Sequence, residues 1–345
     1  MFREDEDFRR IYEYSELVRN TEGQKVDGKE QPMLSSNFDD MGPLLVQLEA
    51  LMRDIGFNDD WEGVTWQRDN KNQRVLVETP LGKYYYPKVA FFLQHHANTD
   101  GYVCSPYVEA LREAHTELNL GAGDRSLDGI AALSMEEFNK LLVKAAEILE
   151  SAKFRENLRV RRRSADRNEA KGLAIEQQAF GSNSCVRVYV LHLGYELQHR
   201  FNVTLQENQQ HRKKFFNNYR DGIVEYIWKN EQGEDTGLHL QLLVFYSADS
   251  CQDVDIVKQI GKYWVKVTGG KGKYWNSNTR TWFHQKYGHD IGAGEINRDD
   301  HAKREALRTY IRYMVWADLF LKMQYSDGCR LFGTSQIKDK EAIVH

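Results

Sequence analysis

The sequence predicts an α+β fold in which an antiparallel sheet is flanked by helices. The first observation is a β-hairpin at residues 222–246, where two apolar, β-rich runs flank a polar segment that contains two glycines. The second is a strand at Cys185–Leu193, which alternates in polarity and is rich in β-branched residues. The third is a pair of amphipathic helical segments, Asp253–Val267 and roughly Asp300–Met323. This order of elements favours helices layered on the sheet.

Residues 1–152 are predicted to form an acidic, mainly helical accessory domain. Helical spacing or capping signals predict three helices there, at Gly42–Asp54, Ser105–Leu118 and Ser134–Ala152. The last begins with a capping box formed by Ser134 and Glu137. Arg74–Tyr86 is expected to form strands around a turn. Because this half contains no catalytic constellation, we expect it to regulate, oligomerise, dock DNA or bind a partner.

Charge is divided unevenly along the chain. Residues 1–150 carry 16 Lys and Arg against 28 Asp and Glu, a net charge of −12, whereas residues 151–345 carry 31 against 23, a net charge of +8. Such asymmetry indicates a polyanion as partner of the C-terminal part, although each half can also simply have its own surface bias. The four cysteines are unpatterned, the N-terminus is too charged for a signal peptide, and no apolar run is long enough for a membrane span. We therefore expect a cytoplasmic protein with reduced thiols.

A basic stretch lies between the two predicted domains. We expect residues 153–180 to form a basic linker, residues 181–326 a second domain, and residues 327–345 a tail. The linker contains four closely spaced arginines that suit non-specific, salt-sensitive phosphate contacts: Arg159, Arg161, Arg162 and Arg163. A solvated helix with ordinary surface charge is the equally weighted alternative.

The hairpin carries a candidate metal site. His239 and Gln241 are two residues apart on the second strand, so both side chains point to one face. If the turn centres near Asp235, Glu231 on the first strand lies opposite His239. A carboxylate, an imidazole and an amide oxygen suit Mg²⁺ or Mn²⁺. Taken alone, however, a His-x-Gln pair on a strand is more often part of a solvated face or a satisfied core histidine.

Two further segments carry candidate site residues. Thr268–Trp275 lacks the Walker spacing, so we expect no nucleoside triphosphate site there. It is predicted to be a flexible loop whose basic and aromatic residues contact single-stranded nucleic acid: Lys271, Lys273, Tyr274 and Trp275. On the last helix, Tyr310 and Tyr313 are three residues apart and share a flank, where a tyrosine could act as a nucleophile on a phosphodiester. Most helical tyrosines, by contrast, lie at a core edge.

The hairpin pattern resembles the HUH/HUQ class of single-strand endonucleases. The wider series YIWKNEQGEDTGLHLQLLVFY, IGKYW, GGKGKYWNSN, GHDIGAGEINRDDHAK and LRTYIRYMVWAD resembles the prophage-encoded inovirus gene-2-product family, also called the YagK/YfjJ C-terminal family. The resemblance extends from about Cys185 to Met323 and leaves residues 1–150 uncovered. It implies an HUH endonuclease-like fold for this part of the chain.

The resemblance also implies site residues and an activity. Glu231, His239 and Gln241 would hold the metal, with Gln241 standing where most members have a second histidine. Tyr313 would match the tyrosine of a Tyr-x-x-Lys motif, whose lysine position is Trp316 here. The implied activity is a rolling-circle replication initiator that nicks single-stranded DNA at an origin and forms a 5′-phosphotyrosine. Because two positions depart from the family pattern, the alternative is a catalytically lost prophage DNA-binding or regulatory protein.

Overall fold

The protein is described by a computed structural model, and the chain divides into two compact units. Unit 1 comprises Met1–Tyr12, Asp39–Arg163 and Asp318–Gln324, and unit 2 comprises Glu13–Phe38, Ser164–Ala317 and Tyr325–His345. The structure describes residues 9–11, 13, 21–26, 29–34, 41–57, 62–95, 101–120, 133–219, 222–233, 236–247, 253–276, 292–324 and 329–337.

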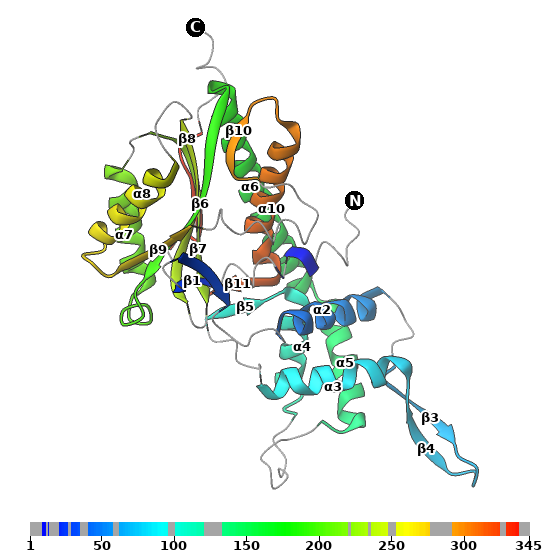
Figure 1. Cartoon of the computed structure of the whole chain (residues 1–345). Helices are drawn as coiled ribbons and strands as arrows, with labels where there is room; N and C mark the ends of the chain where they lie inside the picture. Colours follow the sequence, from blue (N-terminus) through cyan, green and yellow to red (C-terminus); the bar gives the residue numbers. More distant parts are fainter. Residues whose placement is uncertain are drawn as a thin grey trace. The chain divides into compact units, whose positions relative to one another are not determined.

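Unit 1 is mainly helical (Figure 1). Its helices are α2 (Met41–Phe57), α3 (Pro80–His95), α4 (Pro106–Glu117) and α5 (Met135–Leu149). Two antiparallel pairs accompany them: β3 (Val64–Arg68) with β4 (Arg74–Glu78), and β5 (Tyr102–Cys104) with β11 (Leu321–Met323). The three helices predicted from the sequence of this part are confirmed as α2, α4 and α5.

Local capping explains where these helices begin. Ser105 caps α4 by accepting a hydrogen bond from the Val108 N–H, with proline at the first helical position. At α5 the predicted capping box is present, because Ser134 and Glu137 each accept a hydrogen bond from the other's backbone N–H.

One predicted element of unit 1 is wrong. Arg74–Tyr86 was expected to form strands on both sides of a turn, but only β4 is a strand and α3 begins at Pro80. The Thr79 hydroxyl accepts a hydrogen bond from the Gly82 N–H at 3.1 Å. Thr79 therefore acts as a helix cap, and proline at the first helical position needs no hydrogen-bond partner for a backbone N–H.

Unit 2 is built on a six-stranded sheet in which every recorded strand pair is antiparallel. The strand order is β10 (Gly294–Asn297), β6 (Cys185–Tyr195), β8 (Gly237–Ser247), β7 (Ile223–Gly233) and β12 (Phe332–Thr334), and β9 (Gly272–Asn276) also pairs with β6. The predicted hairpin is β7–β8, and the predicted strand is β6. Unit 2 also contains a separate hairpin, in which β1 (Thr21–Val26) pairs with β2 (Lys29–Leu34).

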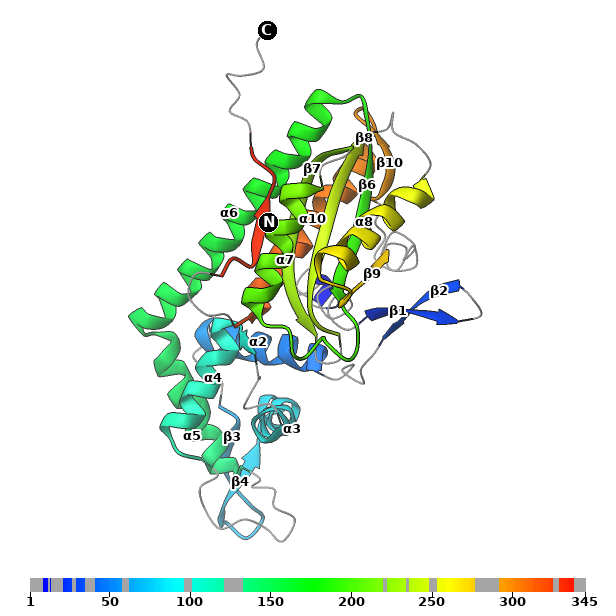
Figure 2. The ribbon, with the colours of Figure 1, turned by 90° about the vertical axis from the view of Figure 1, so that its left-hand side faces the viewer.

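Helices cover both faces of this sheet, which confirms the predicted α+β class. On one face lie α7 (Leu205–Asn218) and α8 (Asp253–Val267), which Figure 2 shows in front of the strands. On the other lie α10 (His301–Phe320) and α6 (Ala152–Ser182) (Figure 1). Each face has its own apolar core, since side chains alternate along a strand.

The alternation along β8 shows how the two cores are separated. Leu240, Leu242 and Val244 pack in the core beneath α7 and α8. Leu243 and Phe245 pack in the core beneath α6 and α10. Because the side-chain period is two, His239 and Gln241 belong to the second face.

Two predicted boundaries differ from the structure. The basic linker expected at residues 153–180 lies within α6, a helix of 31 residues, and its residues are divided between the units after Arg163. The tail expected at residues 327–345 contains β12, which pairs with β7 through Phe332, Gly333 and Thr334. A helix in the basic stretch was one of the two alternatives, and the structure has it as part of α6. Strand β12 was missed because a three-residue edge strand has a weak periodic signal.

The described residues contain no helix of the length and apolarity that a membrane span requires. Cys104, Cys185 and Cys329 are free thiols, as expected, and Cys251 lies outside the described residues.

The Ser134 cap gives a stability prediction. Ser134→Ala removes the side-chain oxygen that accepts the Glu137 N–H, so we expect a loss of about 1 kcal/mol in the free energy of unfolding. Ser134→Asp keeps a capping oxygen and should stay near wild type. Chemical denaturation of the three proteins measures the difference, and equal losses in both variants would contradict the capping role.

Candidate functional site

The register of the β7–β8 hairpin brings four polar side chains to one face of the sheet. Glu231 is paired with His239, and Lys229 is paired with Gln241. Residues two apart on a strand share a face, and directly opposed residues share it too. The four side chains therefore form one block, which we call the polar cluster. The predicted opposition of Glu231 and His239 is confirmed, whereas the turn residue Asp235 lies outside the described residues.

The polar cluster continues the face that α6 and α10 cover. Ile227 precedes Lys229 on the same face of β7 and packs in the apolar core with Leu243, Leu307 and Ile311. The cluster is thus the polar end of a buried surface. His239 and Gln241 are 0% exposed, Lys229 is 1% exposed and Glu231 is 5% exposed.

Hydrogen bonds orient two of the candidate ligands. The His239 Nδ1 lies 3.0 Å from the Gly237 carbonyl oxygen. A carbonyl oxygen can only accept, so Nδ1 carries the proton and Nε2 carries the lone pair of the neutral ring. The Gln241 amide nitrogen donates to the Tyr310 hydroxyl at 2.7 Å, which directs the amide oxygen elsewhere. Fixing the outer atom of a ligand in this way is typical of metal-binding histidines.

Lys229 is the residue of this cluster that our sequence reasoning missed. Its ammonium lies 2.6 Å from the Glu231 Oε1, and both side chains are almost fully buried. Burying two charges is unfavourable unless they pair closely, so each needs the other in the folded protein. The signal was present in the sequence, because Lys229 precedes Glu231 by two residues and must share its face.

The donor set fits a weakly held divalent cation. A carboxylate, an imidazole nitrogen and an amide oxygen are ligands that Mg²⁺ and Mn²⁺ accept. Within the described ranges no three His, Cys, Asp or Glu side chains are grouped to hold a metal ion, so the third donor would be the Gln241 amide. The Lys229 ammonium beside the carboxylate opposes a further positive charge. The cluster can thus hold a metal only against this repulsion.

A histidine and a tryptophan extend the cluster across the neighbouring strands. His192 on β6 is paired with Gln241 on one side and with Trp275 of β9 on the other. The His192 and Trp275 rings stack, with centroids 4.9 Å apart and an interplanar angle of 10°. Gly194 allows this packing, because a Cβ there would lie 3.3 Å from the Trp275 ring and 3.4 Å from the His239 Cβ.

The Tyr310 hydroxyl contacts the cluster by accepting the hydrogen bond from Gln241. Tyr310 is partly exposed, whereas Tyr313 is 6% exposed and lies one turn further along α10. Trp316 donates its indole N–H to Glu169 of α6 at 2.8 Å. The residue at the expected lysine position is therefore engaged with α6.

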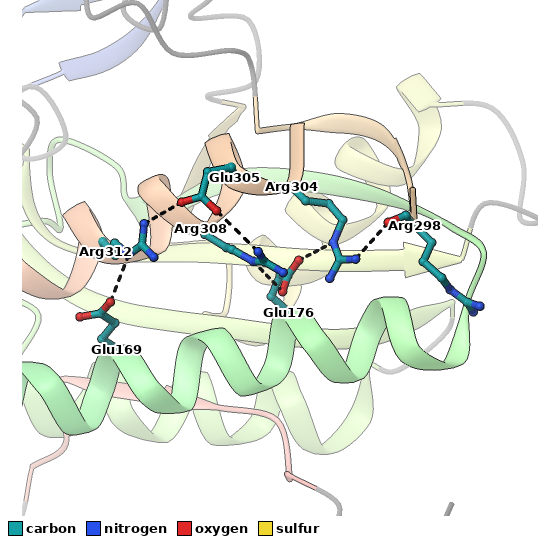
Figure 3. Close-up of polar contacts among 7 residues, drawn as sticks. All are labelled: Glu169, Glu176, Arg298, Arg304, Glu305, Arg308 and Arg312. Atoms are coloured by element: carbon teal, nitrogen blue, oxygen red, sulfur yellow. Dashed lines mark hydrogen bonds and ion pairs between the residues drawn. The ribbon is translucent and has the colours of Figure 1, made fainter. Parts of the chain in front are cut away.

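A ladder of ion pairs fixes α10 against the unit 2 part of α6 (Figure 3). Glu176, which is 0% exposed, accepts from Arg304 at 2.7 Å and from Arg308 at 3.2 Å. Further along the same two helices, Arg312 of α10 lies 3.2 Å from Glu169 of α6. The arginines recur every four residues on one side of α10. Because this ladder sets the position of α10 along α6, it also sets where the α10 tyrosines lie over the sheet.

The arginines of the predicted basic stretch differ in their exposure. Arg159, Arg162 and Arg163 are exposed on α6, and Arg159 pairs with Glu156 at 2.7 Å. Arg161 instead donates to the backbone carbonyl oxygens of Val103, Cys104 and Asp318. Burial lowers the pKa of this guanidinium. Arg161 therefore holds unit 1 together, and its predicted role in phosphate binding has to be corrected.

The predicted flexible loop at Thr268–Trp275 is also wrong. Helix α8 ends in a turn where Gly269 and Gly270 have φ values of 67° and 88°, and strand β9 follows. Such φ values favour glycine because it has no Cβ. The turn and the pairing of β9 with β6 hold this segment in an ordered conformation.

The four nucleic-acid candidates of that segment have structural neighbours. Trp275 is 4% exposed, and Tyr274 packs against the core beneath α8. Lys271 pairs with Glu207 at 2.8 Å, and Lys273 is partly exposed. Both aromatic rings thus pack against other residues of the protein. Their predicted role in stacking on bases is therefore corrected.

Comparison of the chain with protein-family models, with curated proteins and with solved structures finds no match.

The ion-pair ladder gives a second stability prediction. Glu176→Gln leaves Arg304 and Arg308 facing a neutral amide in a buried position, so we expect a loss of about 2–3 kcal/mol in the free energy of unfolding. Glu305→Gln is the matched control, because Glu305 also pairs with Arg308, and with Arg312, but is 54% exposed. It should cost less than about 1 kcal/mol. Equal losses would show that the buried pair adds nothing special.

Proposed function

We propose that unit 2 nicks single-stranded DNA by tyrosine attack with the help of a divalent metal, Mg²⁺ or Mn²⁺. The observation that carries the proposal is the meeting of two elements. The hairpin register places Glu231 opposite His239 and two residues from Lys229, and the Tyr310 hydroxyl from α10 reaches Gln241 in the same cluster. A phenol beside three potential metal ligands is the arrangement that such a reaction requires.

In this proposal Glu231, His239 and Gln241 hold the metal. When bound, it would polarise the scissile phosphate and neutralise charge that develops in the transition state. His239 presents Nε2 because Nδ1 donates to Gly237. The cluster is buried, so water is excluded and electrostatic interactions within it are stronger than in solvent. The substrate phosphate therefore has to enter along the partly exposed Tyr310 side.

Tyr310 is our candidate for the nucleophile, in place of Tyr313, which the family resemblance favoured. The hydrogen bond that Gln241 donates to the phenolic oxygen holds that oxygen beside the proposed metal ligands. The phenolic oxygen forms a bond to phosphorus as the bond between phosphorus and the 3′ oxygen breaks. The phenol loses one proton and the 3′ oxygen gains one, so protons balance. The products are a 5′-phosphotyrosine and a free 3′-hydroxyl that can prime replication at an origin.

The exposed arginines of α6 provide a surface for the DNA backbone. Arg159, Arg162 and Arg163 are exposed, and phosphate contacts by arginine are independent of sequence and weaken with salt. These arginines therefore contribute to the affinity for DNA, and the residues of the polar cluster carry out the nicking reaction.

A second candidate function is a DNA-binding or regulatory protein without catalysis. The burial of the whole cluster and the Lys229–Glu231 ion pair favour it, because a satisfied buried ion pair can exist for structure alone. The two candidates differ in metal binding and in covalent adduct formation.

Adduct formation tests the nucleophile. With Mn²⁺ and a 3′-labelled single-stranded substrate, we expect the wild-type protein to carry the label in a denaturing gel, because the 5′-phosphotyrosine joins it to the 3′ fragment. A 5′-labelled substrate should leave no label on the protein. Tyr310→Phe should abolish this adduct, because it removes the attacking oxygen. Tyr263→Phe on α8, on the opposite face of the sheet, is the matched control. If Tyr313→Phe alone abolishes the adduct, the nucleophile is Tyr313, and if no protein forms an adduct, the non-catalytic candidate is favoured.

Metal titration tests the ligand set. Calorimetric titration with Mn²⁺ should show weak binding by the wild-type protein, and His239→Ala should weaken it at least about tenfold, as loss of even an outer-shell group does. His199→Ala is the control, because His199 lies outside the cluster, between β6 and α7. Mn²⁺ affinity that does not change in His239→Ala would remove His239 from the proposed site.

A further inference from the structure

Lys229 has no role in the proposed reaction, yet it is among the most deeply buried charges of unit 2. Its side chain is 2% exposed, and its ammonium lies 2.6 Å from Glu231 Oε1. It stands opposite Gln241 on one side and opposite Phe332 of β12 on the other. A lysine is rarely buried to this extent unless its charge is paired. The pairing therefore places a fixed positive charge on one of the candidate metal ligands.

We propose that Lys229 is a built-in cation that competes with the divalent metal for Glu231 and is drawn away by a phosphodiester. This inference rests on the proposed function and adds how its site is loaded. Metal and single-stranded DNA would then bind cooperatively at the polar cluster. The Lys229–Glu231 ion pair is the arrangement from which both ligands would have to displace the ammonium.

The charge balance of the cluster supports this inference. Among the described residues, the side chains on this face are one ammonium, one carboxylate, one amide and the two imidazoles of His192 and His239. The charges of Lys229 and Glu231 cancel within their ion pair. Adding a divalent ion alone leaves two net positive charges in a buried site, which is strongly unfavourable.

A phosphodiester anion halves this imbalance. It brings one negative charge to the cluster, and its oxygens are strong acceptors for an ammonium. Once the Lys229 ammonium turns to the phosphate, Glu231 has both oxygens for the metal. The flexible four-carbon stem of lysine allows such a change of partner, which the shorter side chains of the cluster do not. Each ligand thus lowers the cost of binding the other, and such coupling is reciprocal by thermodynamic necessity.

The test measures Mn²⁺ binding with and without single-stranded oligothymidylate as the phosphodiester probe. In the wild-type protein we expect the oligonucleotide to raise Mn²⁺ affinity about tenfold, within the usual range of coupling between two sites. Lys229→Met removes the competing charge while keeping an unbranched side chain. It should bind Mn²⁺ about tenfold more tightly than wild type without DNA, and the oligonucleotide should then add little. Lys258→Met, an exposed lysine on α8, should behave as wild type in both measurements.

Folding of the variant is controlled separately. Lys229→Met leaves the Glu231 carboxylate buried without its ammonium, so the variant should be destabilised and should recover thermal stability when Mn²⁺ is added. The double variant Lys229→Met with Glu231→Gln removes both charges, and we expect it to fold without Mn²⁺ and to gain nothing from it. Recovery of thermal stability on addition of Mn²⁺ in the single variant, and not in the double variant, would support the inference without a measurement of activity.

The outcomes separate this inference from the proposed function. If the wild-type protein binds Mn²⁺ and the oligonucleotide independently, or if Lys229→Met binds Mn²⁺ no more tightly than wild type, the competition is refuted while the nuclease proposal stands. If neither protein binds Mn²⁺ in either condition, the metal site itself is refuted and the inference falls with it. Cooperative binding that persists unchanged in Lys229→Met would assign the coupling to another residue.

Discussion

The antiparallel register of β7 and β8 is the constraint on which the site depends. A shift by one residue would move Lys229, Glu231, His239 and Gln241 to the face beneath α7 and α8, where the side chains of β8 are apolar. Apolar residues fix the register, because Ile227 of β7 and its partner Leu243 of β8 are fully buried beneath α10. The hydrophobic core thus holds four polar groups together at its end, and the Lys229–Glu231 ion pair makes their burial tolerable.

Helix α10 completes the arrangement through a different kind of contact. Its apolar side, with Leu307, Ile311 and Met314, packs on the sheet, while its arginines pair with Glu169 and Glu176 of α6. Packing sets how close the helix lies, and the directional ion pairs set its rotation and its position along its axis. Together they carry the Tyr310 hydroxyl to Gln241. A small movement of α10 would therefore change the contact between Tyr310 and Gln241.

The same closed packing that assembles the cluster limits its chemistry. A buried carboxylate that already has a cationic partner binds a metal less readily than an open one. This feature follows from placing the cluster on a face covered by helices instead of at a sheet edge. In the proposed site, Lys229 is the residue that opposes the metal at Glu231.

The sequence by itself determined part of the secondary structure and which residues of the hairpin share a strand face. The hairpin, the helices with capping signals and the opposition of Glu231 and His239 follow from local periodicity, whose physical origin lies within each element. Only the tertiary structure decided that Arg161 binds carbonyl oxygens in unit 1, that Trp275 stacks on His192, and that Tyr310 contacts the cluster. These contacts join residues far apart in the chain, and side-chain type and spacing alone do not specify which distant partner satisfies a buried polar group or ring.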